Sequence, residues 1–242
     1  VIVVVYGTGI LATWVAPTGF SDTELRNRYA EPSSEHLLGS DELGRDLFSR
    51  IVWGARTTVI VSVFSILSGS LALGVTLGLL AGYLGGRVDN LIMRVGDLFV
   101  SVPTILMLLI INATLRDRVK DIFRDIEDLT SIDGLVSSGV PGYFLLSTTL
   151  AVFGWVGMAR LLRSQVLALR ESNYVVAAQA SGASVWRIIF RHLLPNVSNI
   201  IIVSLTISLG AAGASEIALP FLGVGVQDAP SFGVLIGDYA GA

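Results

Sequence analysis

The stretch TTVIVSVFSILSGSLALGVTLGLLAGYLGG, residues 57–86, has 30 consecutive positions without a charged side chain. About 20 apolar residues of α-helix cross a hydrocarbon core of roughly 30 Å, so this stretch is long enough to span a membrane. Three further charge-free runs follow, at 98–115, 134–159 and 192–215. The sequence therefore predicts four complete spans, at about 58–84, 91–113, 143–168 and 197–219.

The overall composition also indicates a membrane protein. Apolar residues make up 52% of the 242 residues and charged residues only 14%, with a mean hydropathy of +0.73. Such a chain cannot cover itself with the mixed charged surface of a soluble domain, so we expect lipid around it. A net charge of −3 argues against a nucleic-acid partner. The chain has no cysteine, and His36 and His192 are too isolated to indicate a metal site.

The segment YVVAAQASGASVWRIIFRHLLPN, residues 174–196, precedes the last of these spans. Its residues predict two short helices joined by a turn. Ser172 or Asn173 can cap the first helix, and Gly182 supplies a left-handed stop. Ser184 can cap the second helix. A helix-turn-helix of this kind would be a rigid element on the membrane surface.

The same segment predicts a docking surface. Alanine side chains let a partner's backbone approach closely, and one face of the first helix carries small residues beside a tyrosine: Tyr174, Ala177, Ala178 and Ser181. The second helix carries Arg187. It is followed by Leu194 and Pro195, and this proline suits the first turn of the next span. An amphipathic linker lying at the membrane surface is the alternative interpretation.

The spacing within this segment resembles the EAA coupling loop of ABC importer permeases. Ala177 and Ala178 are followed after three residues by Gly182, and after nine more by the run from His192 to Pro195. Val176 stands where the usual glutamate precedes the alanines, and His192 replaces an expected isoleucine. Segments 36–56, 79–103 and 214–238 extend the likeness. By this resemblance the chain is identified as a permease subunit of a binding-protein-dependent ABC importer, of the dipeptide/oligopeptide/nickel transporter family.

The resemblance implies the fold, the partners and the location. The fold would be all-α, a polytopic membrane helix bundle of the type I transmembrane-domain class. Its partners would be a homologous second permease subunit, two ABC ATPase subunits or domains and an extracytoplasmic solute-binding protein. ATP and magnesium are expected in the ATPase subunits and no cofactor in this chain. The protein would lie in the inner or plasma membrane as a multi-pass protein, with the loop 169–196 in the cytoplasm.

Charge alone does not fix this orientation. The side that holds the 160–191 loop has seven lysine and arginine residues and the opposite side nine, so the positive-inside rule does not decide between them. The five arginines of the 160–191 loop nevertheless lie near span ends with only Glu171 among them, whereas the opposite loops carry 13 acids. We therefore expect the loop to be cytoplasmic, chiefly because of the resemblance.

Three segments follow from these predictions. Residues 1–17 are apolar and read as the end of a first span, residues 18–56 as an extracytoplasmic segment, and residues 57–242 as the transmembrane domain. Compared with the family, we expect a fragment that lacks part of the first span and the sixth span. The charged stretch at 116–133 departs from the family pattern, and we interpret it as a solvated helix or a lineage-specific insertion.

Small residues recur every four positions in the 57–86 stretch: Ser70, Gly74, Gly78, Gly82 and Gly86. Such a row lets two membrane helices approach closely, so we expect helix packing, with a pore-lining surface as the alternative. Pro103 predicts a kink in the 91–113 span. Glu216 is the ionisable residue nearest a membrane interior, and we expect a structural role for it rather than proton relay.

Catalytic motifs are absent from the sequence. The sole lysine, Lys120, is not preceded by the glycines of a phosphate-binding loop, so ATP hydrolysis is expected in a separate subunit and this chain is not expected to be an enzyme. The predicted function is the pore subunit of an ATP-driven importer, with di- or oligopeptides leading and nickel or another solute left open. The alternatives are an ion-coupled secondary transporter, for which the sequence offers no relay, and a structural membrane scaffold.

Overall fold

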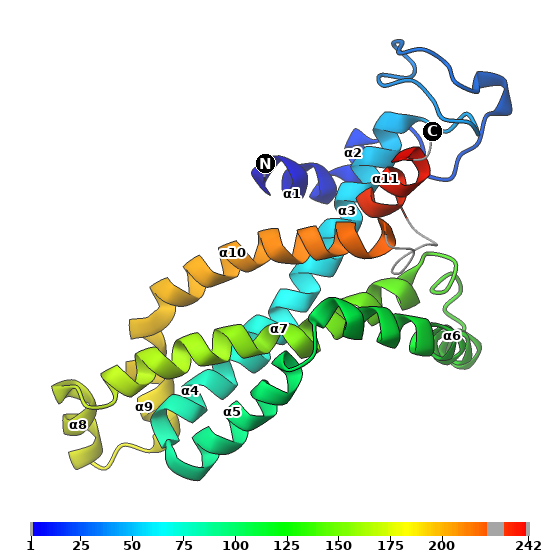
Figure 1. Cartoon of the computed structure of the whole chain (residues 1–242). Coiled ribbons are helices and arrows are strands. Elements are labelled where there is room, and N and C mark those ends of the chain that lie inside the picture. The colour runs from blue at the N-terminus through cyan, green and yellow to red at the C-terminus, as the bar shows by residue number, and fades with distance from the viewer. Residues whose placement is uncertain (1, 222–229, 241–242) are drawn as a thin grey trace. The chain divides into compact units, whose positions relative to one another are not determined.

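The computed structural model describes residues 2–221 and 230–240 (Figure 1). Val1 and residues 241–242, the outer ends of the predicted segments, lie outside the described residues, as do residues 222–229 of the family-like segment 214–238. Within the described ranges there is no β-strand, only an isolated bridge between Ser40 and Asp46. The helices are α1 (Ile2–Ile10), α2 (Ala12–Val15), α3 (Leu47–Ser65), α4 (Thr76–Leu84), α5 (Gly86–Val100), α6 (Thr104–Thr130), α7 (Val140–Leu169), α8 (Asn173–Ala180), α9 (Val185–Ile188), α10 (Leu194–Phe221) and α11 (Phe232–Ala240).

Three helical runs in the described part of the chain are long and apolar enough to cross a membrane: Leu47–Leu84, Val140–Leu169 and Val185–Pro220. Two of them contain wider π-helical turns, η2 (Ile66–Val75) between α3 and α4 and η3 (Ile189–Leu193) between α9 and α10. The runs begin before the predicted spans, because a helix does not have to end at a charged residue such as Arg56.

The predicted single span at 91–113 needs correction. Its residues belong to α5 and α6, which are bent by 78° at the break around Pro103. A proline has no N–H to donate to the carbonyl four residues earlier, and it disfavours helical backbone at the residue before it, here Val102. The chain therefore breaks at this point instead of kinking, and these two helices count as a fourth span only if they are taken together.

The charged stretch at 116–133 is helical as far as Thr130, because α6 continues through it. Arg124 donates to Asp121 at 2.8 Å on an exposed face of this helix. Pairs three residues apart lie on the same side of a helix and stabilise it modestly. The solvated helix expected for this stretch is therefore present as far as Thr130.

The chain divides into two compact units: residues 1–63, 109–147 and 211–242 form one, and residues 64–108 and 148–210 form the other. The second unit is organised by a contact between η2–α4 and α7 in which glycines replace side chains. Ser70 is buried and donates to the carbonyl of Gly154 at 3.4 Å. A Cβ added to any of the next three glycines would lie too close to α7. It would be 2.8 Å from Met158 at Gly74, 2.8 Å from Ala159 at Gly78 and 2.7 Å from Val166 at Gly82.

Gly86, the last residue of the predicted row, lies differently. An added Cβ there would meet no atom within 4 Å, and the residue has φ +53°. Together with Gly85, at φ +63°, it forms the tight turn between α4 and α5. Both residues occupy the left-handed region that glycine enters most easily. The period of four thus ends at Gly82, and Gly86 serves the turn rather than the helix contact.

The close approach of α4 and α7 creates the core of the second unit. Its buried members come from the end of η2, α4, α7, α8, α9, η3 and the start of α10: Val75, Leu79, Met158, Leu162, Val166, Val175, Ile188, Ile189, Leu193, Val197 and Ile201. Burying each large aliphatic side chain contributes roughly 1.5–3 kcal/mol. Because these residues form one cluster, the short helices are packed on the same core as the spans.

Two ion pairs join α5 to α7 within this unit. Arg163 binds both carboxylate oxygens of Asp89, with its Nη2 2.6 Å from Oδ2, and Arg160 donates to Asp97 at 2.6 Å. A bidentate guanidinium–carboxylate pair fixes geometry as well as charge. The half-buried Asp89 pair therefore positions α5 against α7, whereas the exposed Asp97 pair contributes little to stability.

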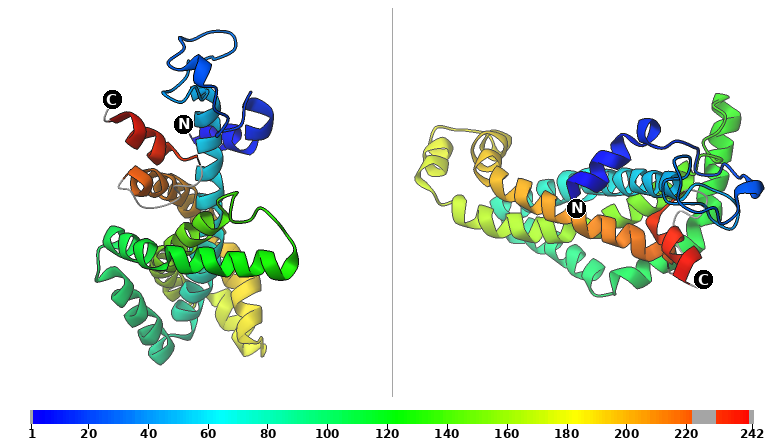
Figure 2. Two further views of the ribbon diagram at one scale, coloured as in Figure 1. Left: turned by 90° about the vertical axis from the view of Figure 1, so that its right-hand side faces the viewer. Right: turned by 90° about the horizontal axis from the view of Figure 1, so that it is seen from above.

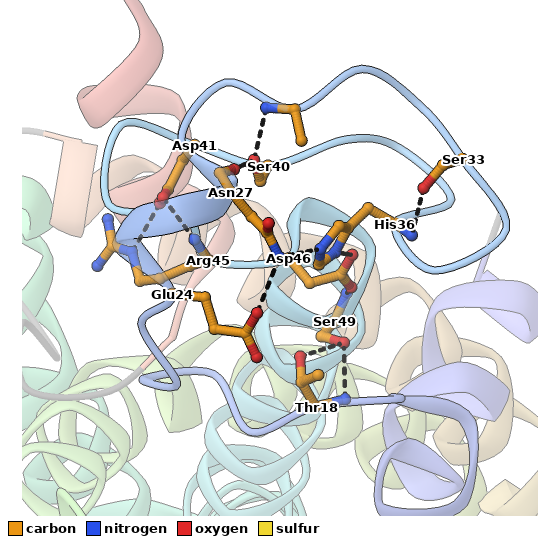
Figure 3. Close-up of polar contacts among 11 residues, drawn as sticks. Thr18, Glu24, Asn27, Ser33, His36, Ser40, Asp41, Arg45, Asp46 and Ser49 are labelled. Carbon is orange, nitrogen blue, oxygen red and sulfur yellow. Dashed lines mark hydrogen bonds and ion pairs between the residues drawn. The ribbon is translucent and has the colours of Figure 1, made fainter.

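In the first unit, the segment before α3 is held by a polar network (Figure 3). Asp41 accepts hydrogen bonds from the backbone N–H groups of Leu43 and Arg45, each at 2.9 Å, and from the Arg45 side chain at 2.6 Å. The buried Arg50 of α3 donates to the same carboxylate at 2.7 Å and to Asp238 of α11 at 3.1 Å. The network thus connects the segment, α3 and α11.

The charge of Asp41 makes this network dependent on pH. Burial by itself raises the pKa of the Asp41 carboxyl, but the hydrogen bonds from Arg45 and Leu43 outweigh it and hold that pKa below its ordinary value. The stabilisation is complete above the unfolded pKa of about 3.9 and is lost as the pH falls through the lower folded pKa. Asp41 therefore contributes fully at neutral pH.

We predict that Gly78→Ala lowers the free energy of unfolding by about 1–3 kcal/mol, because the new methyl group would overlap the Ala159 carbonyl. Gly157→Ala is the matched control: it lies on α7, an added Cβ meets nothing within 4 Å, and alanine favours helix. Thermal midpoints in detergent compare the two variants. Equal midpoints would contradict the assigned contact.

Candidate functional site

The predicted turn between two short helices is present at α8 and α9. Gly182 has φ +75°, the left-handed conformation expected of a helix stop, and its N–H donates to the Gln179 carbonyl at 2.9 Å. Ser172 occupies the N-cap position of α8, but its hydroxyl donates to the Leu169 carbonyl and caps no N–H of α8. Ser184 does cap α9, since its Oγ accepts from the Arg187 N–H at 3.4 Å.

The end of this segment agrees with the prediction in that Pro195 lies in the first turn of α10, but the second short helix is not separate from the span. Pro195 is the second residue of α10, but α9, η3 and α10 follow one another without a break, so the proline does not start a separate helix. A proline inside a helix removes one backbone donor and crowds the preceding turn. The π-helical η3 lies immediately before it, with the Leu194 N–H bonded to the Ile189 carbonyl. A wider turn of this kind accommodates the proline without ending the helix.

An open hollow of about 380 Å³ lies between α8 and the run from α9 into η3, and we call it the docking hollow. Its lining includes five residues predicted from the sequence and three that were not: Tyr174, Ala177, Ala178, Ser181 and Arg187, with Ala183, Arg191 and His192. Arg191 was expected on the second helix with Arg187 but was not among the predicted docking residues, although it lies four positions after Arg187. His192 lies beside Tyr174, with ring centroids 6.4 Å apart.

Three of the predicted coupling residues do not line the docking hollow. Gly182 forms the turn, with open space where a Cβ would lie. Leu194 is half-buried and packs on the core of the second unit, next to the fully buried Leu193. Pro195 is exposed beyond the hollow. These residues therefore help to position the α8–α9 pair and do not form the surface of the docking hollow.

The docking hollow rests on buried side chains. Val175 of α8 is fully buried, and Ile188 and Ile189 are 1% and 2% exposed, all within the core that contains Leu162 and Val166 of α7. Figure 2 shows the yellow α8 at the end of α7. Gln179 also donates to the Tyr83 hydroxyl at 3.2 Å. The pair is therefore fixed to α4 and α7, while its small-residue face stays open.

Glu216 is the second candidate, and it lies in the first unit. It is fully buried on α10, and its Oε2 accepts a hydrogen bond from the Thr58 hydroxyl of α3 at 2.7 Å. The buried Ser231, just before α11, also hydrogen-bonds to the carboxyl group. The side chain thus connects three elements, which is a structural arrangement. Among residues 2–221 and 230–240 no three His, Cys, Asp or Glu side chains gather in a group that could hold a metal ion.

The family follows from a comparison with known proteins. Residues 74–241 match the family described as the binding-protein-dependent transport system inner membrane component. The chain belongs to this family. An all-α, polytopic membrane fold of the type I importer class is therefore established for it, and it is a membrane protein.

Individual relatives are peptide permeases. The dipeptide transport system permease protein DppC of Alkalihalophilus pseudofirmus is 37% identical over 230 residues, 95% of this chain and 67% of that protein. The oligopeptide permease protein OppC of Bacillus subtilis is 32% identical over 98% of this chain and 70% of its own length. The glutathione permease protein GsiD of Pectobacterium atrosepticum is 35% identical over 86% of this chain and 61% of its own length. The chain thus spans about two thirds of the length of these relatives.

We predict that Thr58→Val lowers the free energy of unfolding by about 1–3 kcal/mol, because it leaves the buried Glu216 carboxyl without this hydrogen bond. Thr58→Ser keeps the hydroxyl and is the control. In a Glu216→Leu background, Thr58→Val should have little further effect, since the partner is gone. Thermal midpoints of the parent, Thr58→Val, Glu216→Leu and the double variant measure the coupling between the two side chains. Additive losses would show that the hydrogen bond is unimportant.

Proposed function

We propose that the chain is one of two permease subunits that together form the pore of an ATP-driven peptide importer. The observation that carries the proposal is the α8–α9 pair, which presents five of the predicted coupling residues around one hollow and is packed on the core of the spans. An ATPase subunit docked there would move α4 and α7 through that core. Coupling requires that the docked subunit interact differently with the two states of the pore.

Peptides are the solutes that the relatives favour. The three relatives described above are named for dipeptides, oligopeptides and glutathione. Nickel, which the resemblance left open, has no support among them. A separate solute-binding protein would deliver the peptide, as the family description implies. The family assignment also favours this function over an ion-coupled carrier or a scaffold.

ATP and magnesium belong in this proposal to partner subunits. The chain has no phosphate-binding loop, and its one lysine lies in the charged stretch of α6. The permease would therefore contribute the pore and the coupling helices, and two ATPase subunits or domains would supply hydrolysis. The α8–α9 pair would then face the cytoplasm.

Orientation can be tested by cysteine labelling, because the chain has no native cysteine. Ala180 on α8 and Ser131 after α6 are both exposed. We predict that Ala180→Cys resists a membrane-impermeant thiol reagent in intact protoplasts, whereas Ser131→Cys reacts, because the lipid bilayer excludes the reagent from the cytoplasm. Both should react in detergent. The reverse pattern in protoplasts would place α8 outside and remove the ATPase-docking assignment.

The function itself is tested at Gly182. Valine at φ +75° is strained by about 1–2 kcal/mol, although an added Cβ meets no neighbour within 4 Å, so a defect would report backbone geometry and not crowding. Asparagine tolerates this conformation and is the control. We predict that Gly182→Val abolishes ATP-dependent uptake of a labelled dipeptide by the reconstituted complex, while Gly182→Asn retains it.

Membrane insertion should be normal in both variants, since the spans are unchanged. Recovery of the ATPase subunits with the permease gives the second readout, and Gly182→Val should reduce it. Normal uptake together with normal ATPase recovery for Gly182→Val would argue decisively against coupling through α8 and α9.

A further inference from the structure

The docking hollow has two unlike walls. Ala177, Ala178 and Ser181 form a wall of small side chains on α8. The opposite wall comes from the helix after the turn and carries Arg187 and Arg191, both exposed. A partner group that enters the hollow therefore meets a close backbone on one side and two guanidinium groups on the other.

Some arginines of the 160–191 loop have an acidic partner and others do not. Three of its five arginines have an acid partner within the second unit: Arg160 with Asp97 at 2.6 Å, Arg163 with Asp89 at 2.6 Å and Arg170 with Glu171 at 3.6 Å. Across the described residues, the guanidinium groups of Arg187 and Arg191 have no hydrogen-bond or ion-pair partner. The two arginines without a partner are the two that line the docking hollow.

Two like charges beside one hollow repel each other and gain nothing inside this subunit. A guanidinium group pairs best with a carboxylate, which it can bind through two parallel hydrogen bonds. The loop cannot supply that carboxylate itself. Its one acid, Glu171, pairs with Arg170, and the position before the alanines, where the family usually has glutamate, is Val176, which is exposed.

We propose that the docking hollow receives an aspartate or glutamate side chain of the ATPase subunit, held between Arg187 and Arg191. The inference rests on the proposed docking of an ATPase at this loop and adds which subunit carries the positive and which the negative charge. The permease contributes the cations and the ATPase the acid, which reverses the polarity that a glutamate at position 176 would give. Small residues on α8 let the acidic segment approach.

An anionic lipid headgroup could also pair with arginines near a membrane surface, but the arrangement favours a protein carboxylate. The wall facing the arginines is built of alanines and a serine, which suits a compact side chain. Exposed aromatic residues suited to a lipid headgroup lie elsewhere on the same helical run: Trp186 and Phe190 stack with centroids 5.9 Å apart and do not line the hollow.

The test uses the complete complex of both permeases with its ATPase pair. The key variant is Arg187→Glu with Arg191→Glu, and the conservative variant replaces both residues by lysine. Arg118→Glu on α6 is the control, since it is exposed and changes the charge of an arginine away from the hollow. We expect ATPase capture to fall at least tenfold for the double glutamate variant and to be nearly normal for Arg118→Glu. Double lysine should lose less, because it keeps the charges without the bidentate geometry.

Two further measurements identify the partner group. Capture by the parent complex should weaken as salt rises, and the variant Arg187→Gln with Arg191→Gln should lose most of that salt dependence. Changing the matching acid of the ATPase to arginine should restore capture by the double glutamate variant. Thermal midpoints of the permease confirm that each variant is folded.

The results separate this inference from the proposed function. If the arginine variants capture ATPase normally while Gly182→Val does not, docking stands and the carboxylate contact is overturned. If all of these variants capture ATPase normally, both the docking of ATPase at α8 and α9 and the carboxylate contact are overturned. If the double glutamate variant captures ATPase normally but retains less phosphatidylglycerol than the parent when purified in detergent, the arginines bind lipid, and the inference fails.

Discussion

The contact between residues 69–82 and α7 is the constraint on which the second unit depends. Where a Cβ on Gly74 or Gly78 would stand, a carbonyl or side chain of α7 already lies less than 3 Å away. Two backbones at this separation leave no room for larger side chains between them. The distance between the helices is therefore set by the glycines at the contact and not by interlocking side chains. The short helices pack on the core beside this contact, against Leu162 and Val166 of α7.

Polar groups have different roles in the two units. In the first unit, Glu216 and Arg50 are buried and each connects separate elements. Removing a partner would leave a buried polar group unsatisfied at Glu216 and a buried cation unpaired at Arg50. In the second unit, Asp89 pairs with Arg163 at the border of the apolar core, and the exposed Arg160 pairs with Asp97. These pairs lie within the unit, whereas the exposed Arg187 and Arg191 of the docking hollow are the cations that we propose for a partner.

Sequence patterns predicted the features that depend on local chemistry. Charge-free runs located the apolar helices, and the glycine at 182 located the turn, because these follow from single residues and short periods. They did not predict the π-helical turns, which arise when a helix accommodates a proline or a close neighbour. The break before Pro103 exceeded the expected kink, and Gly86 fell in a turn although it kept the period of the row. Arg191 and His192 were placed in the segment but not on its docking face, because only the folded pair brings them beside α8.

The unbroken run from α9 through η3 into α10 has a consequence for insertions and deletions. Successive helical residues differ in direction by about 100°, so adding or removing one residue within this run would rotate the arginine wall relative to the membrane helix. The turn at residues 181–184 is not helical and can absorb a change of length locally. Between Val185 and the buried Val197, chain length is therefore as strongly constrained as residue identity.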